Sequence, residues 1–262
     1  MKKLILGGVV ILGVGLSGTS AASAIAWNTE TGSSSTSSSC GSGWGNTCTF
    51  NSGGEILKAR GYSTNNDSGT GDFEKARLYV YSGGIGVRNP DQRNESSSPN
   101  HAVDNNGRDD FVVFEYDDPH YNPTGFMIGW KYNDADIRAW IGGESLAAGY
   151  DFTGKDVADL AGLGFTLFSF NNVAVDALNL FNTALTGRYL ILAPQLYDIR
   201  NVADNRHDYF KISEIRGSGT DPIPPAEIPE PGTAALLGIA LAGLWANRSW
   251  MSSPRVRWPR FS

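Results

Sequence analysis

The densest group of side chains that could do chemistry lies around an apolar stretch at residues 111–116. It combines one imidazole with several carboxylates and one amide. Its members are His101, Asp104, Asn106, Asp109, Asp110, Asp134 and Asp136. Carboxylate and amide oxygens are the ligands that Ca²⁺ prefers, although Gly107 comes too early for an EF-hand loop. The group therefore predicts either a structural Ca²⁺ site or ordinary turns, in which Asp and Asn bond to nearby backbone.

A catalytic interpretation of this group centres on His101, which could act as a base beside Asp104 or Asp109. Such a base needs a nucleophile and an orienting partner. The sequence contains neither a G-x-S-x-G elbow nor an H-E-x-x-H motif. Carboxylates suited to glycoside hydrolysis are present, but they are too abundant to be a specific signal. We therefore predict a protein that is not an enzyme, with a secreted hydrolase as the weaker alternative.

Two tryptophans form a second candidate site. Trp130 and Trp140 could stack on sugar rings, as flat aromatic faces do in carbohydrate-binding proteins. Asn105 and Asn106 could then donate hydrogen bonds to sugar hydroxyls. Both tryptophans fall in predicted strands, however, where most tryptophans pack in the core. The sequence leaves these two interpretations open.

The elements that would position these residues are mostly strands. Short aromatic and β-branched runs alternate with Gly, Asn and Asp turns, which is typical of a β-sandwich. The predicted strands are 55–62, 76–81, 111–116, 126–132, 137–141, 164–170, 188–193 and 209–215. Apolar spacing allows short helices at 156–163 and 175–185. We predict an all-β fold with one β-sandwich (jelly-roll-like) domain at residues 40–216 and short helical insertions.

The N-terminus has the pattern of a signal peptide. Lys2 and Lys3 precede a short apolar run, and Ala24-Ile25-Ala26 gives a small-x-small cleavage site. We therefore predict a signal peptide at residues 1–26, followed by a Ser/Thr-rich flexible spacer at 27–39. An exported chain meets an oxidising compartment, so its two cysteines, Cys40 and Cys48, are predicted to form a disulfide.

The net charge disfavours nucleic acid as a partner. The full chain has a net charge of −6, and its two terminal segments carry six cations and no acids. The part between them is therefore near −12, which disfavours nucleic acid as a partner.

The C-terminus has three parts in a fixed order. A Pro/Gly linker at 217–227 leads to Pro229, Glu230 and Pro231, then to an apolar predicted membrane helix at 233–246, then to Arg248 and a basic tail. Residues 228–262 resemble the PEP-CTERM sorting signal of Gram-negative bacteria. This resemblance implies export machinery and an exosortase-type transpeptidase as partners, with the helix holding the chain in the inner membrane at least transiently. A helix kept as a permanent anchor is the alternative.

A central stretch also carries a resemblance. Residues 81–143, including "SPNHAVDNNGRDDFVVFEY" and "IGWKYNDADIRAWIGG", are similar to a family of exosortase-dependent bacterial surface proteins. The resemblance implies a location at the cell surface or outside the cell more than it implies a chemistry. We expect a structural or adhesive role in an exopolysaccharide or biofilm layer, with a carbohydrate-binding module as the alternative.

Overall fold

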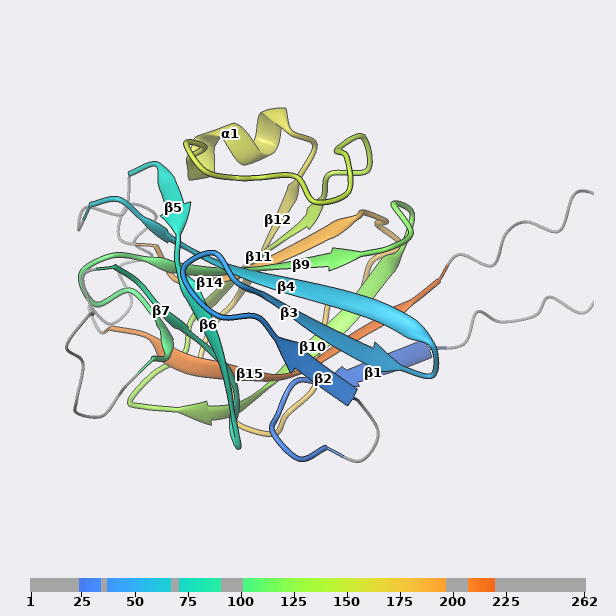
Figure 1. Ribbon diagram of the computed structural model, residues 1–262, viewed down its shortest axis with the longest axis horizontal. Helices are drawn as coiled ribbons and strands as arrows, with labels where there is room; N and C mark the ends of the chain where they lie inside the picture. The colour runs from blue at the N-terminus through green and yellow to red at the C-terminus, as the bar shows by residue number, and fades with distance from the viewer. Residues whose placement is uncertain (1–23, 34–36, 67–70, 91–100, 197–206, 220–262) are drawn as a thin grey trace, which may run out of the picture. The chain divides into compact units, whose positions relative to one another are not determined.

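Alternating apolar residues build two antiparallel sheets that pack face to face as a sandwich (Figure 1). The computed structural model describes residues 24–33, 37–66, 71–90, 101–196 and 207–219. Most of the predicted signal peptide and the whole of the predicted sorting signal lie outside these residues, including Pro229, Glu230, Pro231, the helix at 233–246 and Arg248. Among the described residues, no helix is long and apolar enough to cross a bilayer.

The first sheet contains seven strands, and its two longest members, with ten residues each, are β10 and β15. The main path runs β13 (Asn179–Leu180), β10 (Asn122–Lys131), β15 (Tyr209–Ser218), β7 (Gly84–Arg88) and β6 (Arg77–Tyr81). Two further strands, β1 (Ala24–Asn28) and β8 (Val103–Asp104), also pair with β15. β15 pairs with β8 near its N-terminal end and with β1 near its C-terminal end.

The second sheet contains eight strands. Its path runs β12 (Thr166–Phe170), β11 (Ile137–Gly142), β14 (Tyr189–Pro194), β9 (Asp110–Tyr116), β4 (Glu55–Thr64), β3 (Thr47–Ser52) and β2 (Ser37–Cys40), and β5 (Phe73–Lys75) pairs with β4. All eight predicted strand stretches contain a strand, so the all-β sandwich prediction is confirmed. The uninterrupted apolar run at 111–116 is the central strand β9, and every residue of β9 is buried.

Apolar residues fill two layers. One cluster lies between the sheets and includes Leu78, Val112, Phe126 and Ile212. A second cluster covers the outer face of the eight-stranded sheet, where Phe111 and other strand residues pack under α1 (Val157–Gly162) and the chain around it (Figure 1). Burial on both faces explains why β9, β11 and β14 lack polar alternation.

The short helix begins where the sequence predicts it. Asp156 is its N-cap, and the Asp156 carboxylate accepts from the Asp159 N–H, while the Asp159 carboxylate accepts from the Asp156 N–H. This reciprocal pair is a capping box formed by two aspartates. The second predicted helix, at 175–185, is wrong. Asp176 and Asn182 have φ values of 59° and 48°, left-handed conformations that interrupt a right-handed helix.

The segment at residues 27–39 also differs from its prediction as a spacer. Trp27 lies in β1 and is fully buried, and its indole N–H donates to the Glu55 carbonyl at 3.0 Å. The serines of β2 pair with β3. Ser/Thr composition predicted flexibility, but at this position the serines form an edge strand. The domain therefore begins before residue 40, and β15 carries it to Ser218, beyond the predicted boundary at 216.

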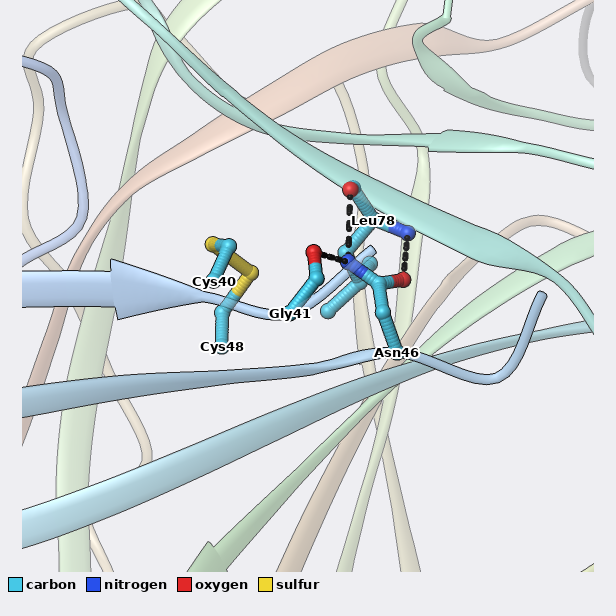
Figure 2. Close-up of a disulfide and its surroundings, with 5 residues drawn as sticks. All are labelled: Cys40, Gly41, Asn46, Cys48 and Leu78. Atoms are coloured by element: carbon cyan, nitrogen blue, oxygen red, sulfur yellow. Dashed lines mark hydrogen bonds between the residues drawn. A yellow bond between two sulfur atoms is a disulfide. The ribbon is translucent and has the colours of Figure 1, made fainter. Parts of the chain in front are cut away.

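The predicted disulfide is present. Cys40 and Cys48 face each other across the β2–β3 pair, with their Cα atoms 4.0 Å apart (Figure 2). The hairpin they close is fastened to the other sheet by Asn46. The Asn46 Oδ1 accepts from the Leu78 N–H at 2.8 Å, and its Nδ2 donates to the Leu78 carbonyl at 3.1 Å and to the Gly41 carbonyl at 3.2 Å. One side chain thus joins the hairpin to the edge of β6.

Candidate functional site

The turn after β10 and the start of β15 bring three carboxylates together. One oxygen each of Asp134, Asp136 and Asp208 lies within 4.8 Å of the others, and all three residues are buried. Asp134 and Asp136 belong to the predicted polar group, whereas Asp208 does not. We call these three residues the acidic cluster.

Asp208 is the hub of the acidic cluster. Its Oδ1 accepts from the Asp136 N–H at 2.7 Å, and its Oδ2 accepts from the Gln195 N–H at 3.2 Å and from the Asn105 side chain at 3.1 Å. The Asp208 N–H donates in return to Asn105 Oδ1 at 2.8 Å. One carboxylate therefore fastens three separate segments to the start of β15.

Charge makes this hub sensitive to pH. Burial raises the pKa of the Asp208 carboxyl, and with the added effect of the Asp136 and Asp134 carboxylates and the opposing effect of the N–H donors this pKa reaches about 7. Arg138 is buried close by, where burial lowers the pKa of its guanidinium and the charges of Asp136 and Asp208 oppose that shift.

The other two carboxylates of the acidic cluster order the turn. Asp134 Oδ1 accepts from the Ala135 N–H at 2.8 Å, and Asp136 Oδ1 accepts from the Asn172 N–H at 2.7 Å. Ca²⁺ requires six to eight oxygen ligands. Both oxygens of Asp208 already accept N–H bonds, so the donor set resembles a backbone anchor more closely than a Ca²⁺ cage.

The remaining predicted ligands lie around β8 and the start of β9. Asp104 Oδ1 accepts from the Asn106 N–H at 3.0 Å, which is an Asx turn, and the Asp109 N–H donates to Thr64 Oγ1 at 3.0 Å. The Asp110 carboxylate accepts from Asn89 at 3.2 Å. Burial raises the pKa of the Asp110 carboxyl well above its usual range, and the charge of Asp104 adds to this effect.

The structure thus divides the predicted group in two and joins the halves through a residue outside it. Asp104 pairs with Tyr209 across β8 and β15, and its neighbour Asn105 binds Asp208. Sequence reasoning missed Asp208 because it lies 72 residues from the Asp136 N–H that it binds. One signal was available, since Asp208 directly precedes a predicted strand just as Asp110 does.

His101 has a different environment. It has a φ of 49° and stacks on the ring of Tyr79, with centroids 5.2 Å apart and planes 16° apart. Its carbonyl lies against Gly86 of β7, where a Cβ would come within 1.6 Å of that oxygen. Only glycine fits there, and His101 rests on the outer face of the seven-stranded sheet.

The two tryptophans also separate. Trp140 is 3% exposed and packs beneath α1 in the second apolar cluster, so burial excludes it from stacking on a sugar at the surface. Trp130 is partly exposed on the seven-stranded sheet, where it pairs with Lys211 across β10 and β15. Lys211 Nζ lies 5.0 Å from the centroid of the Trp130 ring and 4.0 Å from that of Tyr81.

Four rings and two cations lie next to one another on this face, and every member is partly exposed. We call the set the aromatic strip: Trp130, Lys211, Tyr81, His101, Tyr79 and Arg77. The glycines of β7 make room for it, because Tyr79 pairs with Gly86 and Tyr81 pairs with Gly84. Because Gly84 and Gly86 have no side chains, rings from β6 can lie over this part of β7.

Comparisons with protein-family models, curated proteins and solved structures find no match. Functional inference therefore depends on the chemistry of the acidic cluster, of the aromatic strip and of the two ends of the chain.

Proposed function

We propose that the protein is exported and held at the cell surface or in an extracellular matrix, where it has a structural or adhesive role in a polysaccharide or biofilm layer. The observation that carries this proposal is the pairing of β1 with β15. β1 contains the predicted cleavage site, since Ala26 lies opposite Arg216 and Trp27 opposite Ile215, so this site lies beside the strand that precedes the predicted sorting tail. Both predicted cleavage sites would therefore lie toward the same end of the domain, and the domain would be attached to the cell through that end.

The candidate binding surfaces lie toward the other end of β15. The acidic cluster adjoins Tyr209, and at about 3.4 Å per residue this is roughly 30 Å along the strand from Ser218. Lys211 of the aromatic strip lies only two residues from Tyr209. Attachment at one end would leave these surfaces facing away from the cell, which suits adhesion.

The predicted order of events follows from the terminal segments. Residues 1–26 direct export and are removed, and the helix at 233–246 then holds the chain in the membrane for a time. An exosortase-type transpeptidase cleaves near Pro229, Glu230 and Pro231, and the domain is released or attached. The Cys40–Cys48 disulfide supports this placement, since disulfides persist in oxidising compartments.

A non-enzymatic role is supported by the surroundings of the candidate catalytic groups. His101 stacks on Tyr79, and the Asp208 carboxylate is occupied by backbone and amide N–H donors.

Changes to the sorting motif test the placement. We expect Pro229→Ala, Glu230→Ala and Pro231→Ala together to keep the protein in the membrane fraction of native cells, whereas wild type reaches the surface or the medium. The matched control is Pro224→Ala, Pro225→Ala and Glu227→Ala, which makes the same changes in the neighbouring linker. If both triple variants fractionate like wild type, the motif does not direct sorting.

A carbohydrate-binding module is the second candidate function, and the aromatic strip favours it. Glycan binding without turnover would single out this function, whereas turnover would indicate a hydrolase. Loss of biofilm in a deletion strain without any glycan affinity would favour a purely structural role.

A further inference from the structure

We propose that the aromatic strip binds an anionic polysaccharide, with sugar rings against Trp130, Tyr81 and Tyr79 and sugar carboxylates at Lys211 and Arg77. This rests on the carbohydrate-binding function proposed above and names its ligand class.

Three rings of the strip lie close together. Tyr79, Tyr81 and His101 lie nearly parallel, with planes within 31° of one another and centroids no more than 6.3 Å apart. The apolar face of a pyranose stacks on such flat rings. β7 lies between β15, which carries Lys211, and β6, which carries the two tyrosines. Gly84 and Gly86 add no side chain to this face of β7, so a saccharide chain lying across the sheet can meet several rings in succession.

The cations of the strip indicate an acidic ligand. Many other described cations have carboxylate partners: Lys58 with Asp117, Arg60 with Glu115, Lys75 with Asp151, Arg108 with Glu74, and Arg216 with Glu214. Within the described part of the chain, Lys211 and Arg77 instead have ring contacts and form no ion pair with a carboxylate.

The cost of burial points in the same direction. Burial lowers the pKa of the Lys211 ammonium, so this charge is partly removed from water without a carboxylate to offset the loss. A carboxylate on the ligand would supply the missing counter-charge. The strip thus places two cations together on a domain whose net charge is near −12, and that net charge disfavours polyanion binding by the domain as a whole.

The probes for this proposal are three polyuronates, namely polygalacturonate, alginate and polyglucuronate, with fully methyl-esterified polygalacturonate as the neutral control on the same backbone. The full-length gene is expressed in native cells, the protein is purified in whichever form those cells contain, and binding is measured by calorimetry and affinity electrophoresis. We expect binding to at least one polyuronate, weakening with added salt, and at least about tenfold weaker binding to the ester.

Matched variants locate the site. We expect Trp130→Ala and Lys211→Met each to weaken polyuronate binding by about tenfold or more. Trp44→Ala, which removes a 46% exposed tryptophan elsewhere, and Lys58→Met, which removes a paired lysine, should bind like wild type. If Trp130→Ala lowers the Tm so far that binding cannot be measured, Trp130→Phe replaces it. This variant keeps an aromatic ring and should retain partial affinity.

Two results would overturn the proposal: wild type that binds none of the three polyuronates, or binding that is unchanged in both Trp130→Ala and Lys211→Met. Equal binding of the neutral ester would assign the strip to neutral glycans and refute the role of the cations. Because binding is measured on purified protein, its failure leaves the sorting proposal standing, and failed sorting leaves the binding result intact.

Discussion

Asn46 and Asp208 perform the same mechanical task at two places in the sandwich with different chemistry. Each fastens an irregular segment to the backbone of an element that is distant in sequence. Asn46 uses a neutral amide, whose oxygen and nitrogen match the N–H and carbonyl of Leu78. Asp208 uses a carboxylate that accepts three N–H donors but lies beside two other acids.

The difference lies in what each anchor requires of its surroundings. The Asn46 amide satisfies a donor and an acceptor together and has no proton to gain or lose between pH 4 and 9. The ionised carboxylate of Asp208 has acceptors only, and it gains a proton as the pH falls below its pKa of about 7. The disulfide hairpin should therefore hold equally well at any moderate pH, whereas the acidic cluster should be held most firmly when it is protonated.

The largest effect should come from Asn46→Ala. This change leaves the buried N–H and carbonyl of Leu78 without a partner, at about 1–3 kcal/mol for each group. We expect the free energy of unfolding to fall by about 3–4 kcal/mol in urea, by the same amount at pH 5 and pH 8.

Asn51→Ala is the matched control for this change. Asn51 accepts one N–H, from Gly54, in an exposed turn of the same region, so its loss should cost under about 1 kcal/mol. An Asn46→Ala loss that differs between the two pH values would contradict the contrast between the anchors.

The next effect is the pH dependence of Asp208. Its folded pKa of about 7 exceeds the unfolded value near 4, so the folded state binds more protons between those values. Stability from this group is therefore complete below about pH 4 and is lost as pH rises through about 7, with roughly 3 kcal/mol of that loss falling between pH 4.5 and pH 8.5.

The variant Asp208→Asn isolates this contribution, because Asp110 titrates with the same sign and is present in both proteins. We expect the free energy of unfolding of wild type minus that of the variant to decrease by roughly 3 kcal/mol from pH 4.5 to pH 8.5 in urea denaturation. The control Asp117→Asn removes one charge from an exposed ion pair with Lys58 and should cost at most about 1 kcal/mol. A flat difference across this range would refute the assignment.

The disulfide should contribute slightly less than these anchors. Its residues are 8 apart in sequence, and the chain-entropy relation gives about 2.5 kcal/mol for a loop of that size. We expect Cys40→Ser with Cys48→Ser to lower the free energy of unfolding by about this amount. When the two cysteine changes are combined with Asn46→Ala, the loss of stability should be smaller than the sum of the separate losses, because the disulfide and Asn46 constrain the same hairpin. A loss equal to that sum would show that the disulfide and Asn46 act independently.

The smallest effect should be that of Ca²⁺ on the acidic cluster. Because N–H donors occupy both oxygens of Asp208, we expect millimolar Ca²⁺ to shift Tm by less than about 2 °C relative to EDTA. A larger rise at pH 7.5 that is abolished by Asp136→Asn would instead establish the Ca²⁺ site that the sequence left open.

The sequence predicts those features whose cause lies within a few neighbouring residues. The strands follow from alternation within a few residues, α1 from apolar spacing, and the disulfide from two cysteines in a chain predicted to be exported. The predicted helix at 175–185 failed because apolar spacing does not report the left-handed residues inside it. Sandwich formation buried Trp140 and left Trp130 partly exposed, which composition alone does not decide.

The candidate sites depended on pairings that no local pattern encodes. Asp208 reaches the acidic cluster only because β15 returns beside β8 and β10. The aromatic strip exists because three strands align Trp130, Lys211 and Tyr81 over a glycine-bearing fourth. Such sites come from strand register, so their residue types can be noticed in the sequence but their grouping cannot.

The central claim is that this domain is exported and trimmed at both ends, and the intact mass of the protein from native cells tests it most directly. Membrane, cell-surface and medium fractions are measured separately. We predict a surface or medium species that starts near Trp27 and ends near Pro229 to Pro231, with or without added mass. A sole species in the membrane fraction that retains residues 234–262 would contradict the claim and make the tail a permanent anchor.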